Sequence, residues 1–201
     1  CREPYTHDHR RERALYARRQ RTDGNDAAYT SPITITETTI VRAASFPADA
    51  LPGKAATWSY FLRENSTLPI VSLVTDPDNL TGARGIYSNH EQAWSEKWER
   101  EATVAMYEDG GEFSIDCGIR MHGRTSRRVS EKKSFTLKFR GRYGGDLSYD
   151  VFGDGVVTDF SSLLLRASVE DTYTSYMRDE FFARIAMDYT DVPAQNYRYV
   201  S

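Results

Sequence analysis

The chain has 201 residues, of which 39% are hydrophobic and 27% are charged, and its formal net charge at pH 7 is −3. This apolar content is enough to bury a core, so the chain as a whole is not predicted to be disordered. The mildly acidic balance argues against a general nucleic-acid binder, for which a basic excess is expected. No apolar run approaches the roughly 20 residues that a membrane-spanning helix requires.

The first 25 residues carry many arginines and few large apolar side chains. Six of the arginines fall within residues 10–21, namely Arg10, Arg11, Arg13, Arg18, Arg19 and Arg21. Because this composition is typical of a solvated segment, we predict a disordered basic tail over residues 1–25. His7 and His9 flank Asp8, but nothing nearby completes a ligand set, so we assign no metal site here.

Short β-strands are predicted in the segment that follows the tail. Residues 29–36 alternate, residues 38–44 are rich in β-branched side chains, and residues 57–61 form a third candidate strand. Trp58 and Tyr60 fall on one face of that third strand. We therefore expect them to pack in a core rather than to stack on a sugar.

An antiparallel sheet with packed helices is predicted in the rest of the chain. Its expected strands cover residues 68–74, 102–108, 113–121 and 134–140, and a turn is expected over residues 76–79. Cys117 lies on the apolar phase of its strand, which favours a small buried residue over a reactive thiol.

Two helices are predicted from apolar spacing. In residues 90–100, Trp94 and Trp98 are four positions apart and are expected to pin one helix face to the sheet. The second helix covers residues 174–188, where a stripe of apolar side chains recurs at spacing four. The stripe consists of Met177, Phe181 and Ile185.

A loop dense in positive charge joins the strands over residues 113–121 and 134–140. Its cations are Arg124, Arg127, Arg128, Lys132 and Lys133. Gly123 and Ser126 are small residues that let a ligand approach the backbone, and Glu131 is the only carboxylate. This chemistry suits an anion, with polyphosphate as the obvious candidate, and the alternative is a solvated loop without a ligand.

The two neighbouring lysines have opposite phases. Lys133 is in phase with Phe135 and is predicted to project toward the buried face or the cleft beside it, whereas Lys132 points to solvent. Because a buried unpaired ammonium is costly, Lys133 either extends its amine to water or meets an anion. Single-stranded nucleic acid is disfavoured because Phe135 and Phe139 point inward and leave no stacking platform.

An ordered series of short motifs runs through the second part of the chain. It comprises residues 68–73, 85–87, 98–100, 109–111, 118–123, 125–127, 132–135, 149–152, 163–168 and 177–180. This set resembles the N-terminal part of the CotH (spore-coat protein H) family of atypical kinases, over about residues 68–201. Residues 26–66 resemble, in part, the C-terminal β-sandwich module of chitobiases and β-hexosaminidases.

The resemblance implies an α+β fold in two parts. A small β-sandwich-like module over residues 26–66 would precede a truncated kinase N-terminal segment over residues 67–201, built on an antiparallel sheet with packed helices. It implies ATP with Mg or Mn as the cofactor and a serine-bearing protein as the substrate. It also implies a secreted or cell-surface location, with no nucleic-acid partner.

The resemblance also implies a nucleotide site on the basic loop. The residues expected to contact phosphate are Lys133, Arg124, Arg127, Arg128, Ser126 and Gly123. Glu180, or else Glu170, would pair with Lys133 as a helix glutamate does in protein kinases. A surface pair between Glu180 and Arg184 is the alternative.

No catalytic residue is assigned in this chain. No aspartate after Lys133 sits in a matching catalytic motif, so we expect the chain alone to be inactive in phosphoryl transfer. The alternative function is a non-catalytic extracellular module that uses the same basic loop to bind an acidic glycan or protein.

Overall fold

The computed structural model describes residues 15–16, 27–62, 64–169, 175 and 177–201. The chain divides into two units, Cys1–Asn65 and Ser66–Ser201, and each is described by itself. Most of the predicted tail, including the segment from His7 to His9, lies outside the described residues.

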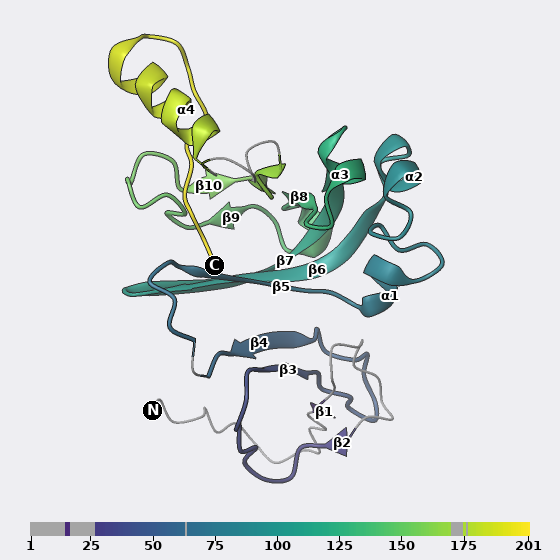
Figure 1. The fold of residues 1–201 in the computed structure, drawn as a ribbon. Helices are drawn as coiled ribbons and strands as arrows, with labels where there is room; N and C mark the ends of the chain where they lie inside the picture. The colour runs from purple at the N-terminus through teal and green to yellow at the C-terminus, as the bar shows by residue number, and fades with distance from the viewer. Residues whose placement is uncertain (1–14, 17–26, 63, 170–174, 176) are drawn as a thin grey trace. The chain divides into compact units, whose positions relative to one another are not determined.

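The first unit contains two pairs of antiparallel strands (Figure 1). Strand β1 (Leu15–Tyr16) pairs with β2 (Ala27–Ala28), and β3 (Thr39–Ala43) pairs with β4 (Ala56–Tyr60). The strands predicted over residues 38–44 and 57–61 are therefore confirmed.

Two predictions for the first unit are wrong. Residues 29–36 form no strand, because they pair with no neighbour and Pro32 lacks the amide hydrogen that a ladder needs. Trp58 and Tyr60 are 47% and 46% exposed, whereas Thr57 is only 7% exposed. The strand therefore turns its opposite face inward, and the two aromatic side chains are not core residues.

The second unit is built on a five-stranded antiparallel sheet in the order β11-β8-β7-β6-β5. The strands are β5 (Ile70–Val74), β6 (Glu99–Glu108), β7 (Gly111–His122), β8 (Ser134–Lys138) and β11 (Ser162–Leu165). The four predicted strands and the α+β class are confirmed. Edge strand β11 was not predicted, because its run of leucines shows no alternation.

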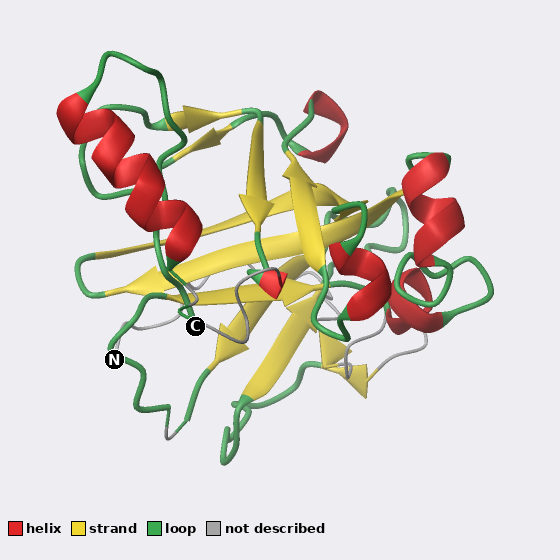
Figure 2. Ribbon diagram, turned by 45° about the horizontal axis from the view of Figure 1, so that its top comes forward, coloured by secondary structure: helices red, strands yellow, loops and turns green. Residues whose placement is uncertain are grey.

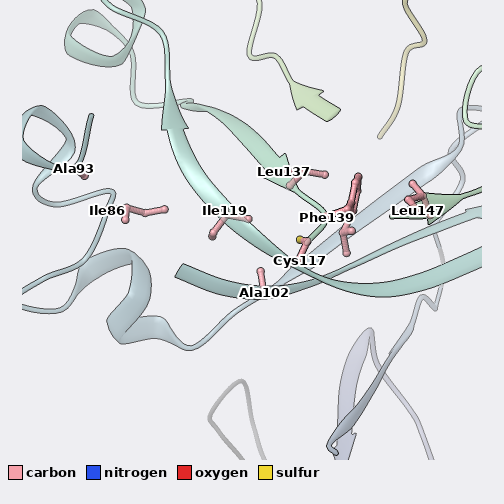
Figure 3. Close-up of a cluster of buried hydrophobic side chains, with 9 residues drawn as sticks. Ile86, Ala93, Ala102, Cys117, Ile119, Leu137, Phe139 and Leu147 are labelled. Carbon is pink, nitrogen blue, oxygen red and sulfur yellow. The ribbon is translucent and has the colours of Figure 1, made fainter. Parts of the chain in front are cut away.

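The core of this unit lies on one face of the sheet (Figure 3). Odd-numbered residues of β7 and β8 point into it, so Cys117 and Ile119 are fully buried and Leu137 is 1% exposed. Ile86 and Ala93 cover them from the segment between β5 and β6. The predicted alternation and the buried position of Cys117 are both confirmed.

Short helices and two further strands surround the sheet (Figure 2). They are α1 (Pro77–Thr81), α2 (His90–Ser95), α3 (Ser126–Val129), the 3-10 turn η1 (Gly141–Tyr143), β9 (Leu147–Ser148), β10 (Asp159–Phe160) and α4 (Arg178–Tyr189). Where a turn was predicted, Asp76 accepts a hydrogen bond from the Asp78 amide at 2.9 Å and caps α1.

The helix predicted over residues 90–100 is shorter than expected. Helix α2 ends at Ser95 because the chain enters β6 at Glu99. Trp98 therefore packs on the core from outside the helix, while Trp94 is 40% exposed. The two tryptophans do not share a helix face, so that prediction is wrong.

Helix α4 confirms the predicted C-terminal helix, but its apolar stripe is not buried. Met177, Phe181 and Ile185 are 55%, 60% and 37% exposed. An ion pair of 2.5 Å between Arg166, after β11, and Asp179 ties the start of the helix to the sheet. Among the described helices, none is long and apolar enough to cross a membrane.

Candidate anion-binding site

The basic loop between β7 and β8 is folded around the short helix α3. Its first residue, Gly123, has φ +88°, a conformation that side chains rarely adopt. A Cβ atom at this position would also collide with the Ser126 hydroxyl, which is itself almost buried. Gly123 is therefore required for the turn that starts the loop, and Ser126 packs against it rather than facing solvent.

Arg127 is a buried brace inside the loop. It is only 2% exposed, and its guanidinium lies 4.2 Å from the centre of the Trp94 ring. One terminal nitrogen donates to the carbonyl oxygens of Gly123 and Arg124, and the other donates to the Glu91 carboxylate at 2.8 Å. These contacts connect α2 to the loop and hold Arg127 within the protein.

Arg128 is held by the same carboxylate but reaches solvent. Its Nε and a terminal nitrogen donate to the two oxygens of Glu91, at 2.5 and 2.9 Å, in a two-pronged contact. The hydrogen bond from Arg128 is the largest cause that lowers the pKa of Glu91 to about 2; burial opposes it, and Arg127 adds to it. The Arg128 side chain remains 61% exposed.

Lys133 closes the far end of α3. Its Nζ donates to the carbonyl oxygens of Arg127 and Ser130, at 2.5 and 2.6 Å, and lies 5.4 Å from the centre of the Tyr87 ring. A cation placed on the last carbonyls of a helix is favourable because those groups carry partial negative charge. Lys132 is exposed and Lys133 is partly buried, so the predicted difference in exposure between the two lysines agrees with the structure.

A hollow of about 400 Å³ lies beside Lys133. It is lined by Thr81, Tyr87, Ser88, His90, Arg128, Val129, Ser130, Glu131 and Lys133. Two cations, Arg128 and Lys133, therefore border one space. The Tyr87 hydroxyl donates to the main-chain oxygen of Glu131 at 2.9 Å, which fixes the aromatic ring at the edge of the hollow.

The structure places the other residues of the predicted site away from this hollow. Arg124 is exposed and takes part in the loop through its main-chain oxygen. Glu180 lies on α4, which is separated from α3 in both views (Figures 1 and 2). Glu170 lies outside the described residues. Within the described part of the chain, the partners of Lys133 are two carbonyl groups and a ring, not Glu180.

Sequence reasoning missed Glu91 and Tyr87. Glu91 was visible only as a carboxylate in the first turn of a predicted helix, and nothing near it in the sequence indicated a contact with the distant loop. Glu131, the carboxylate expected to face the cations, instead contributes its main-chain oxygen. No group of three metal-ligating side chains occurs among the described residues, so no metal centre is assigned.

Comparison with known proteins supports one family for the second part of the chain. Residues 119–201 match the family model described as CotH kinase protein. This segment contains the loop, Lys133, β8, β11 and α4, but not α2 or Tyr87. No curated protein and no solved structure matches the chain. The family match does not reach residues 26–66, so the resemblance of that segment to the chitobiase module stays a prediction.

Proposed function

We propose that this chain is the nucleotide-binding portion of a CotH-like protein kinase, and that the hollow beside β8 receives the phosphates of ATP. The family match over residues 119–201 supports the kinase assignment. The single observation that carries the site is that Lys133 and Arg128 border the same hollow.

Lys133 has one donor left for a ligand. An ammonium carries three N–H groups, and two of them are directed at the carbonyl oxygens of Arg127 and Ser130. The third is free to meet a phosphate oxygen without disturbing the loop. The two carbonyl contacts also hold the ammonium in one place, which lowers the entropy cost of binding.

Arg128 supplies the second contact in this proposal. A guanidinium has five N–H donors, and the two contacts to Glu91 leave the rest available on its exposed side. Arg127, in contrast, uses both terminal nitrogens in internal contacts and is only 2% exposed, so it supports the loop from within. Its Nε is buried without a hydrogen-bond partner among the described residues. Glu91 orients Arg128 through these two contacts.

The residues present fit the phosphates of a nucleotide better than they fit a metal. ATP would supply the transferable phosphoryl group, and a divalent ion would neutralise its charge. The described residues contribute cationic donors and an aromatic edge at Tyr87, but no carboxylate cluster for the ion. A serine-bearing protein substrate and an extracellular or surface location remain part of the proposal through the family resemblance.

A second candidate function is non-catalytic binding of an acidic glycan or protein. The observation in its favour is the exposure of Arg124 and Arg128, whose charges would be accessible to a large anionic ligand. Such a ligand would be held by charge density rather than by a shaped site.

Titration separates the two functions. The chain is titrated with ATP–magnesium and with a sulfated oligosaccharide, each at two salt concentrations, by calorimetry. Saturable ATP binding that is competed by ADP and lost in Lys133→Ala supports the nucleotide site. Tight binding of the sulfated oligosaccharide with no ATP binding contradicts it and favours the binding module.

A further inference from the structure

A second cluster of arginines surrounds a buried carboxylate at the start of β6. The Glu99 side chain is only 6% exposed, yet three guanidinium groups reach it. Arg120 Nε lies 2.6 Å from one oxygen and an Arg140 terminal nitrogen 3.2 Å from the same oxygen, while Arg142 donates to the other. The Tyr143 hydroxyl adds a hydrogen bond of 3.1 Å.

Positive charge is in excess in this cluster. Burial opposes ionisation of Glu99, but hydrogen bonds from Arg120 and Tyr143 hold its pKa below the usual value, so the carboxylate is charged at neutral pH. Three guanidiniums against one carboxylate leave two positive charges. Within the described residues, the carboxylate that contacts these arginines is Glu99.

Hydrogen-bond donors are in excess as well. Three guanidiniums carry roughly 15 N–H groups, whereas a carboxylate offers about four acceptor positions, one of which Tyr143 takes. Most of the donors therefore cannot be satisfied by Glu99. Because Arg140 and Arg142 are 44% and 59% exposed, the unused donors can meet a ligand from solution.

The arginines are held in place rather than free to swing. Arg142 lies 4.7 Å from the centre of the Tyr143 ring, and Tyr143 is 6% exposed. Glu99 leans over Gly118, where a Cβ atom would come within 2.5 Å of its carboxylate. A binding site needs this preorganisation, because immobilising a long side chain costs affinity.

This cluster is separate from the hollow beside Lys133. Gly118 and Arg120 occupy even positions of β7, opposite to the odd positions that point into the core. None of the residues that line the hollow belongs to the cluster.

We propose that Arg120, Arg140 and Arg142 form a second anion site, whose ligand is a phosphate dianion, either inorganic phosphate or a phosphomonoester. A dianion neutralises the two excess charges, and the planar forks of Arg140 and Arg142 match phosphate oxygens in pairs. Glu99 acts as a positioning residue that gathers the guanidiniums. The site does not depend on nucleotide binding at the loop.

The test follows the arginine side chains directly. The Nε–H signals of the full chain are recorded by NMR during titration with inorganic phosphate and, separately, with O-phospho-L-serine. We expect saturable chemical-shift changes at Arg120, Arg140 and Arg142. The ligand that binds more tightly shows whether the site takes inorganic phosphate or a phosphomonoester. Absence of saturable shifts at these three residues overturns the proposal.

Two variants complete the test. Arg142→Gln keeps the Arg120 contact to Glu99 and should weaken phosphate binding by about tenfold or more, as expected for a charged hydrogen bond. Lys132→Gln, at an exposed lysine that belongs to neither site, should change this affinity less than about twofold, as expected for a distant exposed position. Equal losses in both variants would show a general charge effect and refute the site. Because the proposed function is tested by the loss of ATP binding in Lys133→Ala, the two proposals can fail independently.

Discussion

Glu91 on α2 and Arg127 on α3 form an ion pair of 2.8 Å between residues that are 36 positions apart in the sequence. The pair is asymmetric, because the Arg127 side chain is 1% exposed and that of Glu91 is 47% exposed. A carboxylate near the surface therefore compensates a guanidinium inside the protein. The conformation of the basic loop depends on a residue far outside it.

Removal of the Glu91 charge should loosen the loop. In Glu91→Gln, the buried guanidinium of Arg127 loses its counter-ion, and one of the two acceptor oxygens that bind Arg128 is replaced by an NH2 group. We expect faster amide hydrogen exchange over residues 123–130 and a lower melting temperature. Glu131→Gln is the matched control, because that side chain is exposed and only its main-chain oxygen is used. Equal rates of hydrogen exchange in both variants would contradict a stabilising role of the Glu91–Arg127 ion pair in the loop.

The ion pairs of Glu91 with Arg127 and Arg128 also predict that the stability of the protein depends on pH. The two arginines lower the pKa of Glu91 in the folded state from its usual 4.5 to about 2. Its contribution to stability is therefore present above pH 4.5 and is lost as the pH falls through 2. An NMR titration of the carboxyl carbon should show this low midpoint. Arg128→Gln should raise it, because Arg128 is the largest cause of the shift. An unchanged midpoint in the variant would refute this assignment.

The two adjacent lysines should differ in ATP binding. Lys133→Ala removes an ammonium that is fixed at the hollow, whereas Lys132→Ala removes an exposed one. An ion pair at 4 Å is worth about 1 kcal/mol in water and about 4 kcal/mol at an effective dielectric constant of about 20. We expect the dissociation constants of the variants to differ by more than about tenfold, measured by calorimetry. Equal losses would rule out the assignment of Lys133.

A substitution in the core should lower the free energy of unfolding much more than a substitution in the basic loop. Ile119 is fully buried between β6 and β8, so Ile119→Ala should lower the free energy of unfolding by about 2–5 kcal/mol. Val129 lies in the basic loop and is 70% exposed, so Val129→Ala should change the free energy of unfolding by less than about 0.5 kcal/mol. Urea unfolding followed by circular dichroism measures both. A similar loss in the two variants would contradict the position of the core.

Cys117 should resist alkylation in the native protein. Its side chain is fully buried, and burial is the largest cause that raises its pKa to about 12. At pH 8 the thiolate fraction would be roughly a thousandfold below that of a free cysteine, whose pKa is about 8.5. Peptide mapping after iodoacetamide treatment should show modification of Cys117 only after unfolding. Rapid modification of this residue in the native state would contradict the burial.

Four strands of the second unit, β5 to β8, and the core face of their sheet could be predicted from the sequence alone. Alternation in β7 and β8 is a local pattern, and a strand with one buried face must place every second side chain inside. Cys117 and Leu137 follow from that rule, and both are buried. The lower exposure of Lys133 than of Lys132 was also predicted by alternation, although both residues precede β8. These features depend on neighbours in sequence, which is why no three-dimensional information was needed.

Only the tertiary structure decided which charges meet. Arg127, Arg128, Arg120 and Arg142 are all cations in the sequence, and nothing local distinguishes the buried brace from the exposed donors. Glu91 meets Arg127 and Glu99 meets Arg142 because the chain between each pair folds back over the sheet. Electrostatic contacts depend on distance in space and on burial, whereas the periodicity of a strand depends on order along the chain. Local sequence patterns thus determined four of the five strands of the sheet, and the tertiary fold determined the charged sites on it.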